Sequence, residues 1–486
     1  MSNRIVILPG IPDDDNRDYL PERIKGTEYT LNENGNNSQV YPKRLVEHTE
    51  AIVDVEPDTW YEYVPESYDP SKPTPLVFSM HGGLMNGWGQ AIYSSWTMVA
   101  DREGFICVFP SSHTPGMWAL EHPREMKMTS IAGRPIPPSV TPDESRDCKL
   151  VFRLIEIMKQ KYNIDTGRIY MQGMSMGNAM TTMFARAFGN VLAGIGESAG
   201  PTGESLLYNE DGTVKNRGGA LAVFQTRPEF NAWPNDCSPE DVKRNMINRD
   251  YWLTVNGCSS IPQIAIKGEH NFAFYSGGKA DLVFLDIKNR DHGQALDEAE
   301  LMWDYLFSGT RRDAEGKIVQ TDPKIPRKGD EFAIAIAEGC SNAWFRNSVV
   351  PMGGKAIKWQ KLKYHGLNGG QKVRGEYLCV PVRFLAEVFG AEYTPSGDTL
   401  SASLRLDDGR ELQFARGVIG CLIDGHIESM LCEALHRNGE LYISFEWFCK
   451  RLYDLHVSEM AGTIYATDHY SVLSNNMAHI IRDLIR

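Results

Sequence analysis

The sequence has no apolar stretch long enough to span a bilayer, no C-x-x-C pair and no excess of positive charge. A membrane-spanning helix needs about 20 consecutive apolar residues, so we expect no membrane partner. The net charge of −13 argues against nucleic acid or an anionic surface as the main partner. The nine cysteines are odd in number and lack paired spacing, so we expect neither a disulfide framework nor a metal site.

The N-terminal residues lack an apolar run adequate for a signal peptide. The sequence as written therefore predicts a cytoplasmic protein, or an extracellular one if a signal has been removed. Cys237 and Cys258 bracket a helix-like segment and could form a disulfide in an oxidising compartment, the alternative being two buried thiols.

A chain of 486 residues predicts two or three domains. A charged, proline-bearing segment at 321–329 separates two kinds of sequence, because strand-like runs dominate after it. We therefore expect an N-terminal extension (1–54), a catalytic domain (55–320), a smaller module (330–470) and a C-terminal tail (471–486).

Short apolar runs alternate with amphipathic runs across the first large domain. The expected helices lie at 91–103, 145–162 and 295–307. The expected strands lie at 75–80, 105–109, 168–172, 193–196, 220–225, 261–266 and 282–287. Alternation of this kind predicts an α/β fold with a doubly wound, mainly parallel sheet, whose ligands bind at the carboxyl ends of the strands.

Residues 173–177 read Gly-Met-Ser-Met-Gly between a strand-like run and a helix-like run. In this context the G-x-S-x-G pattern is typical of a tight strand-to-helix turn that exposes a nucleophilic serine. Ser175 is therefore the candidate nucleophile, and an acyl-transfer enzyme of this kind also needs a base, an acid and an oxyanion hole.

His292 directly follows the strand expected at 282–287 and is the candidate base. His270, in a polar turn, is the weaker alternative. The acid is sought after the strand expected at 220–225, where Glu229 is the first choice and Asp236 the second. Asp291 adjoins the base, but neighbouring residues rarely face each other in the required way.

Backbone amides are expected to form the oxyanion hole. Met176 follows the nucleophile at a helix start, and Gly83, after His81-Gly82, supplies the second donor, with Leu84 as an alternative. Three tryptophans expected in loops above the sheet could line an aromatic acyl pocket, although buried structural roles are more common for this residue. They are Trp88, Trp118 and Trp233.

Together these residues resemble the polyhydroxybutyrate-depolymerase-like and feruloyl-esterase-like group of α/β-hydrolases. The resemblance runs from about 60 to 307 and is carried by 76–83, 96–110, 162–170, 173–177, 252–258 and 291–293. It implies Ser175 as nucleophile, His292 as base, and Gly83 with Met176 as oxyanion donors. The family usually has Asp in an H-G-T-x-D-like loop, where this chain has Glu229.

The smaller α+β module contains a partial repeat, in which 377–390 is echoed by 441–452, each a strand leading into an amphipathic helix. Its stretch 380–387, Val-Pro-Val-Arg-Phe-Leu-Ala-Glu, resembles the copper-amine-oxidase N-terminal-like stalk domain. That resemblance implies no copper centre and a structural role, or the binding of a protein or polymer partner.

The expected activity is that of a serine carboxylesterase that needs no cofactor and acts on small-molecule or polymer-linked esters. The tryptophan-bearing loops favour hydroxycinnamoyl or aryl esters. Polyhydroxyalkanoate or short-chain acyl esters are the first alternative. A serine peptidase of the same fold and a non-catalytic binding protein with a degenerate site are the others.

Overall fold

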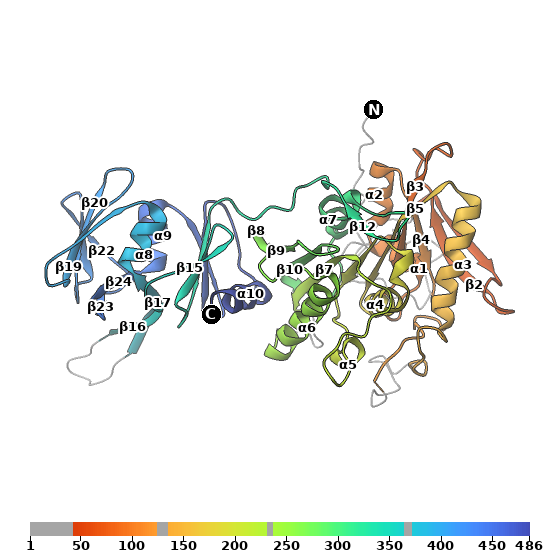
Figure 1. The fold of residues 1–486 in the computed structure, drawn as a ribbon, viewed down its shortest axis with the longest axis horizontal. Coiled ribbons are helices and arrows are strands. Elements are labelled where there is room, and N and C mark those ends of the chain that lie inside the picture. Colours follow the sequence, from red (N-terminus) through yellow and green to blue (C-terminus); the bar gives the residue numbers. More distant parts are fainter. Residues whose placement is uncertain (1–41, 124–134, 231–236, 364–371) are drawn as a thin grey trace, which may run out of the picture. The chain divides into compact units, whose positions relative to one another are not determined.

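The computed structural model describes residues 42–123, 135–230, 237–363 and 372–486. The chain divides into two compact units, Met1–Pro262 with Phe274–Arg327, and Gln263–Ala273 with Lys328–Arg486 (Figure 1). The change of unit after Arg327 falls between the boundaries expected at 320 and 330. The short segment Gln263–Ala273, expected within the catalytic domain, groups with the second unit.

Among the described residues, ten strands form one large sheet. In spatial order they are β1 (Leu45–Glu50), β2 (Asp58–Tyr63), β4 (Ile106–Pro110), β3 (Thr74–Met80), β5 (Ile164–Met174), β6 (Gly194–Ser198), β7 (Ala222–Phe230), β10 (Leu282–Asp291), β9 (His270–Tyr275) and β8 (Gln263–Lys267). Strands β4, β3, β5, β6, β7 and β10 run parallel, and β1 and β2 are antiparallel additions. This is a doubly wound, mainly parallel sheet, as the sequence predicted.

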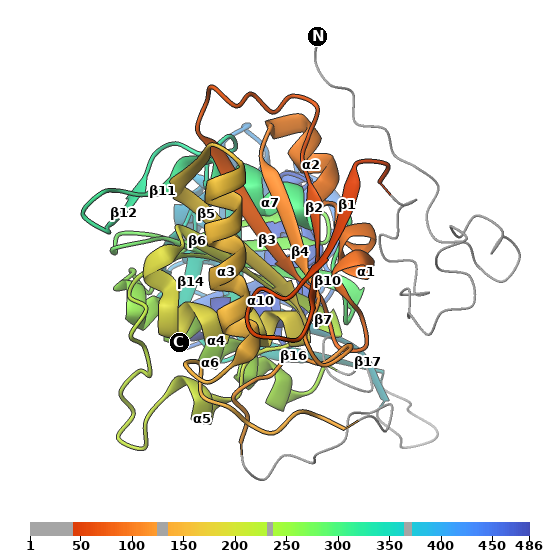
Figure 2. The same cartoon turned by 90° about the vertical axis from the view of Figure 1, so that its right-hand side faces the viewer.

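Helices cover both faces of this sheet. On one face, Arg102 of α2 (Trp96–Glu103) forms ion pairs with Glu300 and Asp304 of α7 (Glu298–Tyr305). Elsewhere, Phe152 of α3 (Arg146–Lys161) packs against Phe184 of α4 (Met176–Phe188). Figure 2 shows α3 and α4 in front of the sheet and α7 behind it. Strands enclosed in this way read as continuous apolar runs, and every residue of β3 and β4 is buried.

Several predicted elements differ from the observed ones. The helix expected at 91–103 is two helices, α1 (Gly87–Tyr93) and α2, because the backbone is extended at Ser94. The first unit also contains α5 (Glu204–Leu207), α6 (Pro239–Asn256) and a hairpin of β11 (Thr310–Arg312) and β12 (Ile318–Gln320). Part of the expected N-terminal extension belongs to the sheet as β1.

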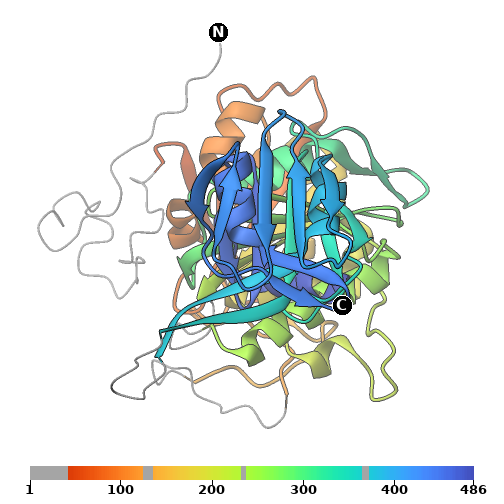
Figure 3. The same ribbon diagram turned by 90° about the vertical axis from the view of Figure 1, so that its left-hand side faces the viewer.

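The described part of the second unit contains three antiparallel sheets, drawn mainly in blue in Figure 3. The first has β15 (Ser348–Pro351), β14 (Asn342–Phe345), β13 (Ala333–Ala337), β26 (Thr463–Thr467) and β25 (His456–Met460). The second has β16 (Ile357–Lys363), β17 (Lys372–Pro381), β24 (Glu440–Ser444) and β23 (Leu435–Arg437). The third has β18 (Glu392–Pro395), β19 (Ser401–Arg405), β20 (Glu411–Ala415), β21 (Gly420–Ile423) and β22 (His426–Ser429).

The repeat noted in the sequence corresponds to two strand–helix–strand units. Strand β17 leads into α8 (Val382–Phe389) and then β18, and β24 leads into α9 (Phe445–Tyr453) and then β25. The two units meet where β17 pairs with β24. Residues 471–486, expected as a tail, instead contain α10 (Asn475–Ile485), whose Met477, Ile481 and Ile485 are fully buried.

None of the helices that the structure describes is both long and apolar enough to cross a membrane.

Candidate active site

Ser175 occupies a strained turn between β5 and α4. Its backbone angles are φ 56° and ψ −114°, a conformation that costs free energy in a non-glycine residue. Two close approaches require the flanking glycines. A Cβ on Gly173 would lie 2.0 Å from Gly177 O, and one on Gly177 would lie 2.1 Å from Met80 O. The G-x-S-x-G pattern is therefore explained by sterics, and it confirms the predicted strand–turn–helix context.

The imidazole of His292 reaches the hydroxyl of Ser175. His292 Nε2 lies 2.9 Å from Ser175 Oγ. The backbone amide of Ser175 donates to Ser198 O at 2.9 Å and Ala199 O at 3.1 Å, which holds the turn over the end of β6. Gly200 follows at φ 86°, and a Cβ there would lie 3.9 Å from His292 Cε1. The structure thus brings together the two residues expected as nucleophile and base.

His292 directly follows β10, which is longer than expected and irregular at its end. The β7–β10 register shifts between Ile287 and Asp291, and Asn289 adopts φ 56°. Asp291 pairs with Phe230 as the last strand residue. This bulge ends the strand and turns the chain, as bulges beside active sites often do. His270 begins β9 and belongs to the other unit.

Glu229 lies inside β7, which continues to Phe230, and not in a loop after the strand as expected. Its carboxylate is buried and accepts from Lys288 Nζ at 2.8 Å and from Asn289 N at 3.0 Å. Both donors belong to the bulged segment that precedes His292. Glu229 therefore ties the end of β7 to the segment carrying the histidine. Asp236, the alternative acid, lies outside the described residues.

The two expected oxyanion donors are neighbours. A Cβ on Gly83 would lie 3.1 Å from Met176 Sδ. Met176 is the first residue of α4, and amides at that position have no acceptor within the helix. Leu84 was expected as an alternative donor, and this expectation is corrected, because its amide donates to Gly116 O at 2.8 Å. The amide of Ser175 is likewise engaged, which leaves Gly83 and Met176 as candidates.

A buried histidine, His81, supports the loop that carries Gly83 through two hydrogen bonds. Ser112 N donates to His81 Nε2 at 3.0 Å, so Nδ1 carries the proton and donates to Gly82 O at 2.7 Å. Burial lowers the pKa of His81 to about 4, so the ring is neutral near pH 7. Trp118 stacks on this ring and donates from Nε1 to His81 O at 2.8 Å.

Of the three tryptophans expected to line an aromatic pocket, the two that the structure describes are almost fully buried. Trp118 is 1% exposed and Trp88, within α1, is 3% exposed. Trp118 is committed to His81, so its role in substrate binding is corrected to a structural one. Trp233 lies outside the described residues. The described tryptophans therefore give no support to an aromatic acyl group.

Asp147 organises the segment that reaches the Gly83 loop. Its buried carboxylate, in the first turn of α3, accepts from His113 N at 3.0 Å and from Ala119 N at 2.7 Å. The segment between these amides contains Gly116, the partner of Leu84 N. Burial raises the pKa of Asp147. In the sequence, an aspartate at the start of a helix indicates a helix cap. The sequence gives no sign that Asp147 binds the distant amides of His113 and Ala119.

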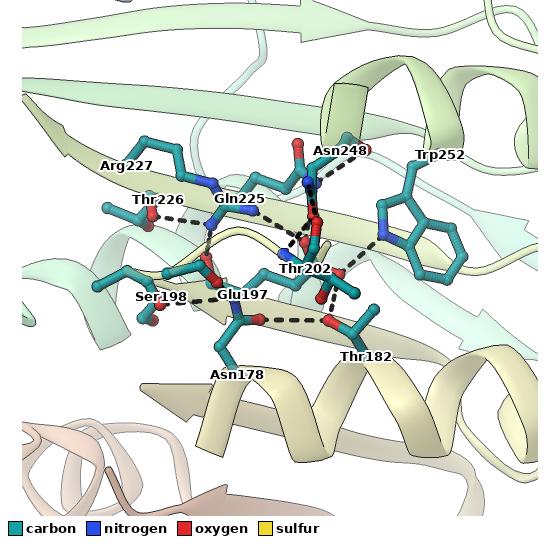
Figure 4. Close-up of polar contacts among 12 residues, drawn as sticks. Asn178, Thr182, Glu197, Ser198, Thr202, Gln225, Thr226, Arg227, Asn248 and Trp252 are labelled. Atoms are coloured by element: carbon teal, nitrogen blue, oxygen red, sulfur yellow. Dashed lines mark hydrogen bonds and ion pairs between the residues drawn. The ribbon is translucent and has the colours of Figure 1, made fainter. Parts of the chain in front are cut away.

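A buried ion pair joins the neighbouring strands β6 and β7 (Figure 4). Arg227 Nη2 lies 3.2 Å from Glu197 Oε2, and both side chains are fully buried. The Glu197 carboxylate also accepts hydrogen bonds from three neutral side chains, which come from α4, α6 and β7. These are Thr182, Trp252 and Gln225.

This pair is coupled to Ser175 through the backbone. Arg227 Nη1 donates to Thr226 O at 3.1 Å, and the same carbonyl accepts from Ala199 N. Ala199 O in turn accepts from Ser175 N. Sequence reasoning missed this network, since isolated charged residues in apolar strands are the only signal, and they identify no partner.

A second buried acid, Glu298, lies at the start of α7. It is hydrogen-bonded to Ser198 Oγ and accepts from Ala295 N at 3.1 Å. Burial raises its pKa to about 7. Ser198 also accepts from Gln172 Nε2 at 2.8 Å, so these polar side chains link α7 to the strand ends beneath Ser175. Nothing in the sequence marked Glu298 among the acids of this helix.

In the parts of the chain that the structure describes, no group of three or more His, Cys, Asp or Glu residues could hold a metal ion. Of the two possibilities for Cys237 and Cys258, a disulfide or two thiols, the structure has two thiols, and Cys258 Sγ donates to Ala280 O at 3.1 Å.

Comparisons with known proteins find esterases. The chain is 30% identical over 252 residues to a bifunctional acetylxylan esterase/xylanase of Neocallimastix patriciarum, covering 51% of this chain and 33% of that protein. It is 29% identical over 136 residues to feruloyl esterase B of Neurospora crassa, covering 27% of this chain and 40% of that protein. The chain thus spans less than half the length of these relatives. No protein-family model matches.

Among solved structures, an acetyl xylan esterase from Aspergillus awamori is similar, with a TM-score of 0.40 and 15% identity, over 53% of this chain and 97% of that one.

Proposed function

We propose that the chain is a serine carboxylesterase in which Ser175 is the nucleophile and His292 the general base. The observation that carries the proposal is the 2.9 Å separation of His292 Nε2 and Ser175 Oγ on a glycine-flanked turn. The sequence similarity to an acetylxylan esterase and a feruloyl esterase supports it, since both are named as enzymes that cleave carboxylic esters.

In the reaction, Ser175 Oγ attacks the ester carbonyl carbon while His292 Nε2 takes the hydroxyl proton. The amides of Gly83 and Met176 stabilise the negative charge that develops on the carbonyl oxygen. His292 then returns the proton to the leaving alcohol, which yields an acyl-enzyme. Water, deprotonated by the same imidazole, attacks the acyl carbon and releases the carboxylic acid with restoration of Ser175.

An acid is needed to orient the imidazole and to stabilise the imidazolium. Glu229 is proposed for this task, because its carboxylate binds Lys288 and Asn289 just before the histidine. The comparison of Glu229→Gln with Asp236→Asn tests the assignment. The larger loss of kcat, with KM little changed, identifies the acid. A larger loss in Asp236→Asn would leave Glu229 as a residue that only fixes the bulge.

A small acyl group such as acetyl is the first candidate for the acyl part of the substrate. The relative matched over more of this chain is named an acetylxylan esterase. A Cβ on Gly82 would lie 2.9 Å from Met174 Cε and 3.4 Å from Met85 Sδ, so methionine side chains crowd the glycine loop. Hydroxycinnamoyl esters are the second candidate, supported by the similarity to feruloyl esterase B over a shorter segment.

The deciding experiment is labelling with a fluorophosphonate, which phosphonylates activated serines. We expect wild type to react and Ser175→Ala and His292→Ala to remain unlabelled while giving the same far-UV spectrum. Absence of labelling in folded wild type would contradict the proposal and favour a binding protein. A panel of acetylated xylan, methyl ferulate, hydroxybutyrate oligomers and an aminoacyl amide then ranks kcat/KM. Preferential cleavage of the amide would indicate a peptidase.

A further inference from the structure

Two buried cysteines of the second unit lie side by side. Cys379 Sγ and Cys432 Sγ are 3.7 Å apart, although 53 residues separate them in the chain. Both side chains are buried, at 0% and 1% exposure, in a small cluster with Leu435 and Tyr442. We propose that Cys379 and Cys432 form a disulfide when the chain folds under oxidising conditions.

The geometry allows this bond with a small movement. A disulfide brings the two sulfur atoms to about 2.05 Å, so they must approach by less than 2 Å, which side-chain rotation can supply. Cys379 lies on β17 next to Leu378 and Val380, which face the main core of the unit. Since side chains alternate along a strand, Cys379 points to the opposite face, where Cys432 lies.

The bond would join two parts of the fold. Cys379 belongs to the sheet β16–β17–β24–β23, whereas Cys432 follows β22, the last strand of the sheet β18–β22. The chain between the two cysteines contains α8 and that whole five-stranded sheet. The disulfide would therefore close a long loop, and a crosslink across a long loop removes much conformational freedom from the unfolded chain.

The reaction is thiol–disulfide exchange. The two thiols lose two protons and two electrons to a disulfide oxidant, such as oxidised glutathione, which is reduced to two thiols. The hydrogen bond to Cys432, together with burial, raises the pKa of Cys379. Since the thiolate is the reacting form, the folded protein should oxidise slowly. The bond is therefore expected to form during folding, before the sulfur atoms are enclosed.

The test uses the full chain, refolded in reduced or oxidised glutathione buffer, quenched with acid and alkylated. Peptide mapping by mass spectrometry should find Cys379 linked to Cys432 only after oxidising refolding. The melting temperature of the second unit should rise by about 10 °C, and dithiothreitol should reverse the rise. Cys432→Ser should show neither effect. Cys421→Ser, at another buried cysteine of the same unit, should behave like wild type.

The proposal would be overturned if the peptide map of wild type refolded under oxidising conditions showed both cysteines fully alkylated. Linkage of either one to a different cysteine would also overturn it. Because the mapping is made on wild type, the test remains decisive even if a variant fails to fold. Native protein placed in the oxidising buffer without unfolding provides the kinetic comparison, and its linkage should appear much more slowly than during refolding.

Discussion

His292 Nε2 lies 2.9 Å from Ser175 Oγ although 117 residues separate the two in sequence. The serine follows the end of β5 and the histidine follows the end of β10. Strands β5, β6, β7 and β10 are parallel neighbours, so their carboxyl ends lie at the same edge of the sheet. A hydroxyl at this distance can transfer its proton to the imidazole as it attacks.

Because serine and histidine act as a unit, their losses should not add. Ser175→Ala and His292→Ala are each expected to lower kcat by a factor of about 10³ or more, and the double variant should lose no more than the worse single one. Steady-state kinetics on nitrophenyl acetate measures this. His270→Ala is the matched control and should retain activity. Multiplicative losses in the double variant would indicate that the two side chains act separately.

The glycines of the serine turn are expected to be intolerant of a single methyl group. A Cβ on Gly177 would lie 2.1 Å from Met80 O, so Gly177→Ala must displace β3 from α4. We expect a drop in kcat/KM of about 10²-fold or more, because small displacements of catalytic groups are costly, together with a lower melting temperature.

Gly203→Ala is the control for this substitution, since nothing lies within 4 Å of a Cβ at that position. It should retain near wild-type activity and stability. Wild-type kinetics in Gly177→Ala would show that the turn can relax, and the steric explanation of the pattern would then be wrong.

The sequence allowed prediction of the parts whose signals are local. Ser175 could be found because its turn needs glycines at fixed positions. His292 could be placed because the strand before it begins with an apolar run, Leu282 to Leu285. The bounds of β7 were mispredicted, since Thr226 to Phe230 is polar in sequence yet still pairs with β10, and Glu229 was therefore expected in a loop. Pairing with a distant strand overrides local propensity.

The supporting side chains could not be predicted for a different reason. Trp118, Asp147 and Arg227 act through partners far away in the chain, such as His81 O and Ala119 N. Their residue types are compatible with many roles, and only the assembled fold selects one. The tryptophans illustrate the consequence, because the expectation of substrate contact rested on residue type and on a predicted place in loops, neither of which identifies a partner.

Trp118 is expected to support catalysis by fixing the Gly83 loop. Its Nε1 donates to His81 O at 2.8 Å, and Trp118→Phe removes that hydrogen bond while keeping an aromatic ring. We expect kcat to fall by about 10-fold with KM nearly unchanged, since a displaced oxyanion donor weakens transition-state binding more than substrate binding. Trp303→Phe, which loses a bond to Glu103, is the control. An equal effect in both variants would point to general destabilisation.

Removing the charge of one partner of the buried pair Glu197–Arg227 should lower the free energy of unfolding. Glu197→Gln would leave the guanidinium of Arg227 buried without its counter-charge, and such changes cost about 3–5 kcal/mol. Urea unfolding of the full chain measures the loss. Glu156→Gln, at an exposed pair with Lys159, should change stability by no more than about 1 kcal/mol. A small effect in Glu197→Gln would mean that the neutral amide satisfies the arginine.

Glu298 is expected to make stability fall as pH rises toward neutrality. Its folded-state pKa is raised from 4.5 to about 7 by burial, whereas in the unfolded chain it ionises near its ordinary pKa. Between these pH values the folded state holds a proton that the unfolded state has released, so the free energy of unfolding declines across that window, by up to about 3 kcal/mol, and levels off above it.

Glu298→Gln cannot ionise yet retains groups able to bond Ser198 Oγ and Ala295 N. The difference in unfolding free energy between variant and wild type should therefore grow in the variant's favour as pH rises from 4.5 to 7. Taking this difference removes the contribution of His81, whose lowered pKa acts in the opposite sense over a similar range. A flat difference for Glu298→Gln would mean that the buried carboxyl remains ionised, its charge compensated by the electrostatic interaction with Arg227.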